Sequence, residues 1–325
     1  MCPASLAFFV DLEPAVADFR DSVVTGLSQS PRRLACKFFY DSTGLELFGR
    51  ICETPEYYVT RTETALLRTV GPQIAALAGP AASVVEFGVG SDAKIRLLLD
   101  ALDRPAQYVA IDIAGSTLRD TARAIATDYP ALRVGAICAD FTTLAALPYE
   151  AAARAGGVAL GFFPGSTIGN FAPPEAEAFL RQIRAVLGPG GALLIGVDLK
   201  KDTARLNAAY NDAAGHTAAF NLNLLHRMVG ELGAELDIGG FEHYAFYNEA
   251  ESRIEMHLRS LRIQEIRVGD RYFELDSGEL IHSENSYKYS LGGFRDLAGR
   301  AGFDASASWT DDGDLFSIHF LRVSD

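Results

Sequence analysis

The stretch that decides the fold is VVEFGVGSDAK, residues 84–94. A short β-branched, apolar run enters a Gly88-x-Gly90 turn, and helical apolar spacing begins at Lys94. Glycines in such a turn permit unusual φ angles and close approach of the backbone to a ligand. The N–H groups of the following helix N-terminus are free to bind it. The third glycine of the dinucleotide fingerprint is missing, because Ala93 occupies that neighbourhood, and this argues against a pyrophosphate site.

Outward from this turn, strand-like and helix-like segments alternate. We expect strands at 83–87, 107–112, 133–140, 158–165 and 191–199, and helices at 62–78, 94–102, 116–130 and 173–191. Near-continuous apolar strands that alternate with helices indicate a buried parallel sheet covered on both faces. With right-handed crossovers, the sequence predicts an α/β fold with a doubly wound, Rossmann-like sheet.

The rest of the chain predicts a second, discontinuous α+β domain. After Lys200 the alternation stops: residues 202–231 are mostly helical in pattern and 239–275 hold strand-like runs. A helix and two strands after Ser290 then complete the interrupted sheet. We therefore expect one domain from 62–200 and 287–325, and a second from 1–61 and 201–286. Within 1–61 we expect a helix at 13–27.

Composition narrows the function. The 325 residues carry 29 basic and 42 acidic side chains, a net charge of −13. This balance argues against nucleic acid and against anionic membrane surfaces as partners. The four cysteines lack zinc-ligand spacing and a disulfide framework, so no metal site is predicted. Without a basic leader or an 18-residue apolar run, we expect a cytoplasmic protein, and a monomer, acting on a small molecule.

Acids stand at the ends of the second and third expected strands. Asp112 ends YVAID, where a carboxylate accepts hydrogen bonds from both ribose hydroxyls, and Asp140-Phe141 ends CADF, an acid and a ring suited to adenine. Together with the glycine turn they point to S-adenosylmethionine. The alternative is that both acids are helix N-caps. Lys94 either extends into solvent or reaches the methionyl carboxylate of this cofactor.

The fourth strand ends in FFPGSTIGNFAPPE, residues 162–175. Strand ends of a doubly wound sheet face the ligand crevice. Asn170 both donates and accepts hydrogen bonds, so its carbonyl oxygen suits an amine nucleophile. The alternative is a turn in which Asn170 caps the next helix.

Motifs along nearly the whole chain resemble those of the histidine-specific Nα-methyltransferases of ergothioneine biosynthesis. They are KFFYD (37–41), PEYYVTRTE (55–63), EFGVGSDAK (86–94), ADF (139–141), GSTIGN (165–170), DLKKD (198–202), AYNDAAGHTAAFN (209–221), RIEMHLR (253–259) and SENSYKY (283–289). The resemblance implies a class I methyltransferase sheet and trimethylation of L-histidine at its α-nitrogen. The product would be the betaine hercynine, and S-adenosylmethionine would leave as S-adenosylhomocysteine.

The resemblance also implies roles for individual residues. Carried onto this sequence, the cofactor-binding positions are Gly88, Gly90, Lys94, Asp112, Asp140 and Phe141, and the histidine-binding positions are Tyr40, Phe48, Tyr57, Gly165, Asn170, Tyr210, Met256, Glu284 and Ser286. Asn170 and Tyr57 would orient the α-amine. Tyr210 and the Gly165 backbone would hold the carboxylate, and Glu284 with Ser286 would bind the imidazole.

The assigned chemistry is physically consistent. An α-amine loses its proton near neutral pH, so an orienting polar cage suffices. E-x-S places a carboxylate and a hydroxyl on one face of a strand, as an imidazole requires, although such a pair is commonly surface decoration. Tyr40, Phe48 and Tyr57 offer ring faces for a trimethylammonium, or are ordinary core aromatics.

Two positions depart from the family pattern, and three other functions remain as alternatives. Val59 and Asn285 replace a proline and an apolar residue, and Asn285 stands between the two expected imidazole ligands. The alternatives are an Nα-methyltransferase of tryptophan or tyrosine on the same scaffold, an NAD-dependent oxidoreductase, and a catalytically silent binding module.

Overall fold

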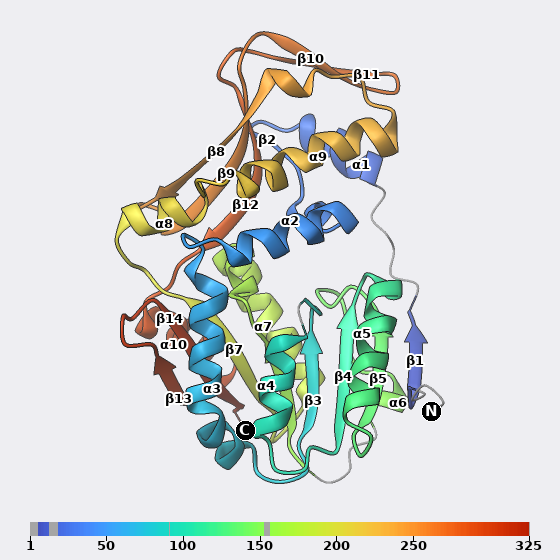
Figure 1. Cartoon of the computed structure of the whole chain (residues 1–325), viewed down its shortest axis with the longest axis vertical. Helices are drawn as coiled ribbons and strands as arrows, with labels where there is room; N and C mark the ends of the chain where they lie inside the picture. Colours follow the sequence, from blue (N-terminus) through green and yellow to red (C-terminus); the bar gives the residue numbers. More distant parts are fainter. Residues whose placement is uncertain (1–5, 13–18, 91, 153–156, 325) are drawn as a thin grey trace. The chain divides into compact units, whose positions relative to one another are not determined.

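The computed structural model describes residues 6–12, 19–90, 92–152 and 157–324. By contacts within the chain these residues form two units. The first takes the described residues of Met1–Ala15, Arg61–Leu199 and Tyr289–Asp325, and the second those of Val16–Thr60 and Lys200–Lys288. Each unit is built from segments distant in sequence (Figure 1).

The first unit alternates strands and helices. Its elements are β1 (Phe8–Asp11), most of α3 (Tyr58–Ala78), β3 (Ser83–Phe87), α4 (Ala93–Ala101), β4 (Gln107–Asp112), α5 (Gly115–Asp128), β5 (Arg133–Cys138), α6 (Tyr149–Ala152), β6 (Ala159–Phe163), the 3-10 turn η2 (Thr167–Asn170), α7 (Pro173–Leu187), β7 (Ala192–Asp198), α10 (Leu291–Arg300), β13 (Phe303–Thr310) and β14 (Phe316–Val323). The strands form one eight-stranded sheet in the order β1-β5-β4-β3-β6-β7-β14-β13.

The direction of the strands confirms a doubly wound α/β fold. Strands β1 to β7 of this sheet run parallel, whereas β14 pairs antiparallel with both β7 and β13. The chain leaves β3 for β4 on one side and later returns to its other side as β6. A ligand crevice forms at such a reversal, outside the carboxyl end of the strands. The Gly88 turn lies at that end of β3.

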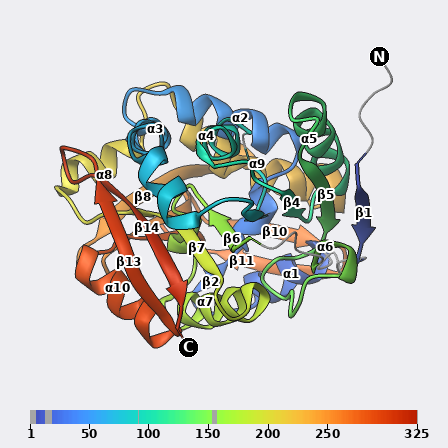
Figure 2. The ribbon, with the colours of Figure 1, turned by 90° about the horizontal axis from the view of Figure 1, so that it is seen from below.

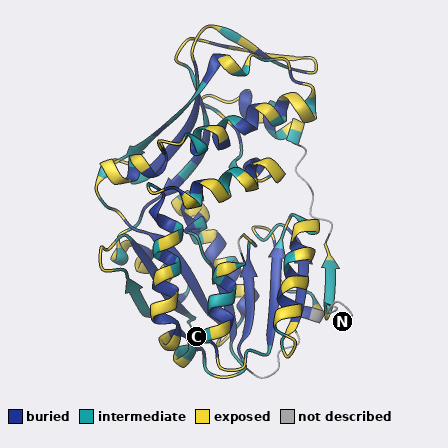
Figure 3. Ribbon diagram, in the orientation of Figure 1, coloured by how far each residue is buried: buried dark blue, intermediate teal, exposed yellow. Residues whose placement is uncertain are grey.

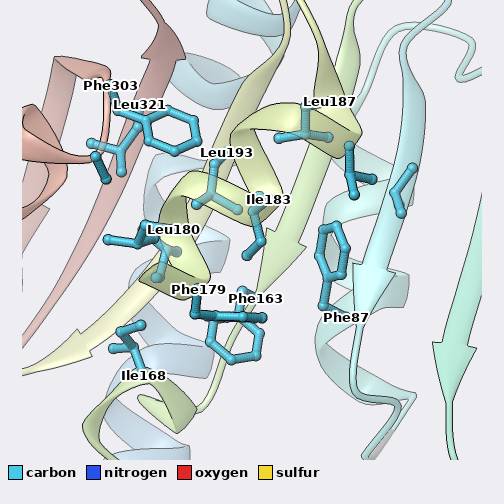
Figure 4. Close-up of a cluster of buried hydrophobic side chains, with 14 of the residues drawn as sticks. Phe87, Phe163, Ile168, Phe179, Leu180, Ile183, Leu187, Leu193, Phe303 and Leu321 are labelled. Atoms are coloured by element: carbon cyan, nitrogen blue, oxygen red, sulfur yellow. The ribbon is translucent and has the colours of Figure 1, made fainter. Parts of the chain in front are cut away.

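Helices cover both faces of the sheet, as buried strands require. Figure 2 shows α3, α4 and α5 on one face and α6, α7 and α10 on the other. Figure 3 shows the central strands as buried and the outward sides of the helices as exposed. On the α7 side the core packs Phe87, Phe163, Phe179 and Leu193, with Phe303 and Leu321 from the last two strands (Figure 4).

One expected boundary is wrong. The sequence analysis placed all of residues 1–61 in the second domain, but β1 pairs in parallel with β5 at the edge of the eight-stranded sheet, with Phe8 opposite Gly135. Gly135 makes room for this strand, because a Cβ there would lie 2.1 Å from the Phe8 ring. A four-residue edge strand leaves too short an apolar pattern to be found from sequence.

The second unit is α+β, as expected. Its elements are α1 (Phe19–Leu27), β2 (Arg32–Arg33), η1 (Cys36–Phe39), α2 (Ser42–Glu53), α8 (Thr203–Ala209), α9 (His216–Leu232), η3 (Ile238–Gly240), β8 (Phe241–Asn248), β9 (Arg253–Ser260), β10 (Gln264–Val268), β11 (Arg271–Leu275) and β12 (Leu280–Tyr287). One sheet has the order β2-β12-β9-β8, and β10 pairs with β11. The helix expected at 13–27 is seen as α1, and residues 13–18 lie outside the described residues.

No described helix is both long enough and apolar enough to cross a lipid bilayer.

Candidate functional site

The glycine turn after β3 is hydrogen-bonded to the end of β4. Gly88 has a φ of +80°, and a Cβ there would lie 3.2 Å from the Phe141 ring. The next residue, Val89, donates its backbone N–H to Asp112 Oδ2 at 2.8 Å. Gly88 is therefore required by conformation and by the ring beside it. A Cβ on Gly90, by contrast, would meet no atom within 4 Å, so this structure gives no packing reason for that glycine.

Neither predicted strand-end acid caps a helix. Asp112 accepts from the Ala114 N–H at 2.8 Å, but the N-cap of α5 is Ala114. Asp140 Oδ1 accepts from both the backbone N–H and the hydroxyl of Thr142 in a turn. The alternative that these acids are helix N-caps is thus wrong, and both stand at strand ends on the ligand side of the sheet.

Phe141 follows Asp140 and lies in an aromatic corner. Its ring centroid is 5.9 Å from that of Phe163 and 5.7 Å from that of Phe179. The glycine turn, the two acids and this ring occupy the ends of three adjacent parallel strands, β3, β4 and β5. This arrangement fits an adenosine: carboxylates for the hydroxyls and the amine, and a ring to pack beside the base.

Lys94 does not extend into solvent. Its Nζ forms an ion pair with Glu63 on α3, whose side chain is 1% exposed. The Glu63 carboxylate also accepts the Gly165 N–H, at 3.0 and 2.9 Å to its two oxygens. Glu63 thus joins the start of α4 to the turn after β6. Gly196 on β7 leaves room for it, since a Cβ there would lie 2.0 Å from Glu63 Oε1.

This arrangement bears on the predicted role of Gly165. Gly165 has a φ of +82°, so a glycine is favoured there. Its N–H is engaged by Glu63, and a contact between that N–H and a substrate carboxylate would require Glu63 to release it. Glu63 lies within the PEYYVTRTE motif, but nothing in the sequence indicates its partners.

Asn170 lies at the end of the turn that follows β6. It ends the 3-10 turn η2, whereas the N-cap of α7 is Ala172, so the helix-cap alternative is wrong. Within the described part of the chain, the Asn170 side-chain amide makes no hydrogen bond. Both its donor and its acceptor are therefore available at the end of β6.

In the second unit, five aromatic side chains from the stretches 40–57 and 210–220 form what we call the aromatic cluster: Tyr40, Phe48, Tyr57, Tyr210 and Phe220. Ring centroids are 5.9 Å apart for Tyr40 and Phe48, 6.2 Å for Phe48 and Tyr57, and 6.3 Å for Tyr57 and Tyr210. Phe220 on α9 lies 6.0 Å from Phe48 and was not predicted. The four predicted aromatic positions are thus brought together.

The predicted imidazole ligands lie on β12 of the same unit. Glu284 and Ser286 are two residues apart after an irregularity in the strand, and Glu284 is directly opposite Met256 on β9. Side chains two apart share a face of a strand. Tyr210 OH lies 2.8 Å from Ser286 Oγ, which connects this face to the aromatic cluster.

Burial changes the acid–base properties of these groups. Burial raises the pKa of Glu284 to about 7, and the nearby Lys288 ammonium opposes that increase. Burial, followed by Tyr210 and other nearby groups including Glu284, holds the pKa of Tyr57 well above its usual value. Tyr57 therefore remains a neutral phenol, suited to orienting an amine through hydrogen bonds and unsuited to accepting its proton.

Lys288 is a second functional candidate that the sequence analysis did not single out. It is the lysine of SENSYKY, it is 2% exposed, and its Nζ donates to Ser286 Oγ at 2.8 Å and to Tyr210 OH at 3.1 Å. Its position two residues after Ser286 was the only signal in the sequence.

Asn285, which departs from the family pattern, does not point toward Glu284 and Ser286. His282 Nε2 and Asn285 Oδ1 lie 2.8 Å apart. Adjacent residues of a strand point to opposite faces, so Asn285 faces away from Glu284 and Ser286. The other departure, Val59, is buried in the first turn of α3.

The sheet order, the glycine turn and the acids at the ends of β4 and β5 define an S-adenosylmethionine-dependent methyltransferase of the doubly wound class. Residues 19–323 match the family model described as "Histidine-specific methyltransferase, SAM-dependent". The chain belongs to this family.

Relatives of known name agree with this assignment. A histidine N-alpha-methyltransferase of Mycolicibacterium smegmatis is 40% identical over 97% of this chain and 98% of its own length. One from Mycobacterium tuberculosis is 40% identical over 92% and 93%. A more distant relative, a 4-dimethylallyltryptophan N-methyltransferase of Epichloe festucae var. lolii, is 27% identical over 96% and 98%.

Proposed function

We propose that this chain transfers methyl groups from S-adenosylmethionine to the α-nitrogen of L-histidine, three in succession, to give hercynine. This is the first step of ergothioneine biosynthesis. The family and the two relatives at 40% identity support histidine as the substrate. The observation that carries the proposal is the face of β12, where a buried carboxylate and a hydroxyl stand side by side beside Tyr210 and opposite Met256.

An imidazole has two ring nitrogens that both need partners when they are buried. Glu284 supplies an acceptor for an N–H, and Ser286 supplies a hydroxyl for the second nitrogen. The thioether of Met256, 2% exposed, bounds this face with an apolar surface that suits the ring carbons. An indole offers only one N–H and no acceptor, so it could hydrogen-bond to only one of these two side chains.

S-adenosylmethionine supplies an activated methyl group on its sulfonium sulfur. In the proposal Gly88, Asp112, Asp140 and Phe141 hold its adenosine part and Lys94 its carboxylate. The task left to the chain is alignment of a neutral amine with that methyl group. The proposal assigns this to Asn170 through its amide oxygen and to Tyr57 through its hydroxyl. The Gly165 N–H holds the substrate carboxylate once Glu63 releases it. The Tyr210 hydroxyl donates to Ser286 Oγ and so has no proton left for the carboxylate that the sequence analysis assigned to it.

Each methyl transfer to a neutral amine gives an ammonium. The first two products lose a proton to water before the next transfer, and the third transfer leaves a permanent quaternary cation. Aromatic faces attract quaternary ammonium groups. The aromatic cluster therefore suits the methylated intermediates as well as the product, and it explains why a family site that binds a small polar amino acid contains so many rings.

Calorimetry on a Glu284→Ala variant tests the assignment of the imidazole. We expect histidine affinity to fall at least tenfold, because a charged hydrogen-bond acceptor is lost, and S-adenosylhomocysteine affinity to stay unchanged. The matched control is Glu279→Ala, which removes a partly exposed carboxylate paired with Arg32 elsewhere in the unit. Unchanged histidine affinity in Glu284→Ala would contradict the assignment.

The second candidate is Nα-methylation of tryptophan or tyrosine, which a relative acting on a tryptophan derivative keeps open. A panel of these three amino acids, each with S-adenosylmethionine and analysed by mass spectrometry, separates the two. We further propose that the protein is a cytoplasmic monomer. Light scattering of the purified chain tests its oligomeric state, and a dimer would contradict that part of the proposal.

A further inference from the structure

We propose that Lys288 is a positioning residue that makes Ser286 a hydrogen-bond donor, and that the site thereby binds the neutral imidazole in one tautomer. In that tautomer the unprotonated ring nitrogen faces Ser286 and the N–H faces Glu284. The inference rests on the proposed assignment of Glu284 and Ser286 to the imidazole.

Three polar groups form a closed triangle. Lys288 Nζ lies 2.8 Å from Ser286 Oγ and 3.1 Å from Tyr210 OH, and these two oxygens lie 2.8 Å apart. Lysine is almost never fully buried unless it is paired, and Lys288, 2% exposed, donates to two hydroxyls near the Glu284 carboxylate. Burying a charged ammonium costs free energy, so its burial beside two hydroxyls indicates a function beyond packing.

The protons of the triangle can be assigned from chemistry. An ammonium has only donors, so both oxygens accept a hydrogen bond from Lys288. One proton lies between the two hydroxyls. A phenol, with a pKa near 10, is far more acidic than the alkyl hydroxyl of serine, so Tyr210 donates and Ser286 accepts. The Ser286 oxygen then accepts from two donors, which uses both of its lone pairs, and its own proton points out of the triangle.

This assignment fixes what Ser286 can bind. A group that meets the free proton of Ser286 must be an acceptor, which on an imidazole is the unprotonated nitrogen. The opposite nitrogen then carries the N–H, and the Glu284 carboxylate is the acceptor two residues away on the same strand face. The doubly protonated imidazolium has no acceptor to offer Ser286, and it would also bring a positive charge toward Lys288.

The alternation of β12 and the residue after it provides the arrangement. Glu284, Ser286 and Lys288 are at positions i, i+2 and i+4, which an extended chain places on one face. The Glu284 carboxylate, the Ser286 hydroxyl and the Lys288 ammonium thus follow one another along the strand. The ammonium donates to the hydroxyl oxygen and so leaves the hydroxyl as a donor.

Nitrogen-15 NMR of histidine labelled in both ring nitrogens tests the inference directly. The complex contains the full chain, S-adenosylhomocysteine and the labelled histidine at pH 7. We expect one N–H nitrogen and one unprotonated nitrogen in a single tautomer. Two N–H nitrogens, or a mixture of both neutral tautomers, would overturn the inference. Failure of histidine to bind at all, measured by calorimetry, would overturn the proposed function instead.

Lys288→Met supplies the second test. Without the ammonium, Ser286 is free to accept or to donate, so we expect a second tautomer or the imidazolium to appear, with histidine affinity about tenfold lower and S-adenosylhomocysteine affinity unchanged. The control is Lys200→Met, which removes an exposed lysine and should leave the spectrum unaltered. A Lys288→Met complex that keeps the single tautomer would contradict the proposal. If that variant does not fold, Ser286→Ala replaces it, with the same loss of the single tautomer expected.

Discussion

Glu284 is subject to two opposing influences, burial and the Lys288 ammonium, and burial dominates. With a pKa of about 7, the carboxyl is about half ionised at neutral pH in the absence of a ligand. Burial raises the pKa values of the nearby phenols Tyr40 and Tyr57 well above their usual range, and the Glu284 charge adds to both shifts, so the phenols stay neutral. Histidine binding through an ionised Glu284 should therefore depend on pH.

The expected result is a fall in histidine affinity as the pH drops from 8 to 6. Because only the ionised carboxylate accepts the imidazole N–H, protonation through a pKa of about 7 should weaken binding about tenfold over this range. The histidine ligand also titrates between pH 6 and 8. The measurement is therefore the difference between the native protein and Glu284→Gln, because that variant keeps only the titration of the ligand. Parallel profiles for the two proteins, followed by calorimetry, would contradict this role.

The two glycines of the turn after β3 should respond differently to alanine. Gly88→Ala places a Cβ in the left-handed region and 3.2 Å from Phe141, so we expect it to lower stability by about 1–2 kcal/mol. Gly90→Ala meets no atom of the chain, and its melting temperature should equal or exceed that of the native protein.

The affinity for S-adenosylhomocysteine tests the predicted role of Gly90 in cofactor binding. If the cofactor approaches the backbone at Gly90, then Gly90→Ala should bind S-adenosylhomocysteine at least tenfold more weakly while remaining fully folded. Native-like affinity in a stable Gly90→Ala protein would remove Gly90 from the predicted cofactor site.

At the scale of elements, Asp41 fastens two helices of the second unit. Its Oδ1 accepts the Gly44 N–H at 2.8 Å, which caps α2, and the Asn223 side chain of α9 at 2.8 Å. These helices carry Phe48 and Phe220 of the aromatic cluster. Asp41 therefore controls the spacing of rings that it does not itself contact.

Asp41→Ala should lower the free energy of unfolding by about 1–2 kcal/mol through loss of the cap. It should also weaken histidine binding more than S-adenosylhomocysteine binding. Asp41→Asn is the matched control, because asparagine caps helices well and keeps the oxygen. Equal effects of both substitutions in chemical denaturation would show that the charge, and not the cap, matters.

The sequence predicted elements with long apolar patterns well and short ones poorly. The parallel strands and the helices between them lie where expected, because buried strands and amphipathic helices have strong periodicity. Strand β1 was placed in the wrong domain, because four residues carry no clear period. Helix α2 was not predicted, although Ser42–Glu53 have an amphipathic helical pattern.

The predictions for the site also differ between residues with a local sequence signal and residues without one. The sequence analysis assigned roles to residues in recognisable motifs, such as Asp112, Asn170 and Glu284, and those roles remain predictions. Glu63 and Lys288 were quoted within motifs but given no role, because their partners Gly165 and Tyr210 are distant in sequence. The meaning of a single charged side chain depends on such long-range contacts, which periodicity does not reveal.

For the whole molecule, the division into two units places most of the residues predicted for the two ligands in different units. The predicted cofactor residues are all in the first unit, together with Gly165 and Asn170, and the remaining predicted histidine residues are all in the second. Each ligand should therefore protect a different set of segments from amide exchange.

Hydrogen exchange measured with each ligand alone checks this separation. S-adenosylhomocysteine should slow exchange in 86–94, 109–114 and 138–143, and histidine should slow it in 40–57 and 254–258 and around β12. A bound ligand slows exchange most in the segments whose local opening would break its contacts. Histidine protection confined to the first unit would contradict the assignment of its side-chain contacts to the second.

The most direct test of the central claim is a competition for methyl groups. Equal amounts of histidine, tryptophan and tyrosine are incubated with the protein and S-adenosylmethionine, and tandem mass spectrometry locates each added methyl group. The account predicts histidine with one, two and finally three methyl groups, all on the α-nitrogen, and little change in the other two amino acids. Preferential methylation of tryptophan or tyrosine, or methyl groups on the imidazole ring, would contradict it.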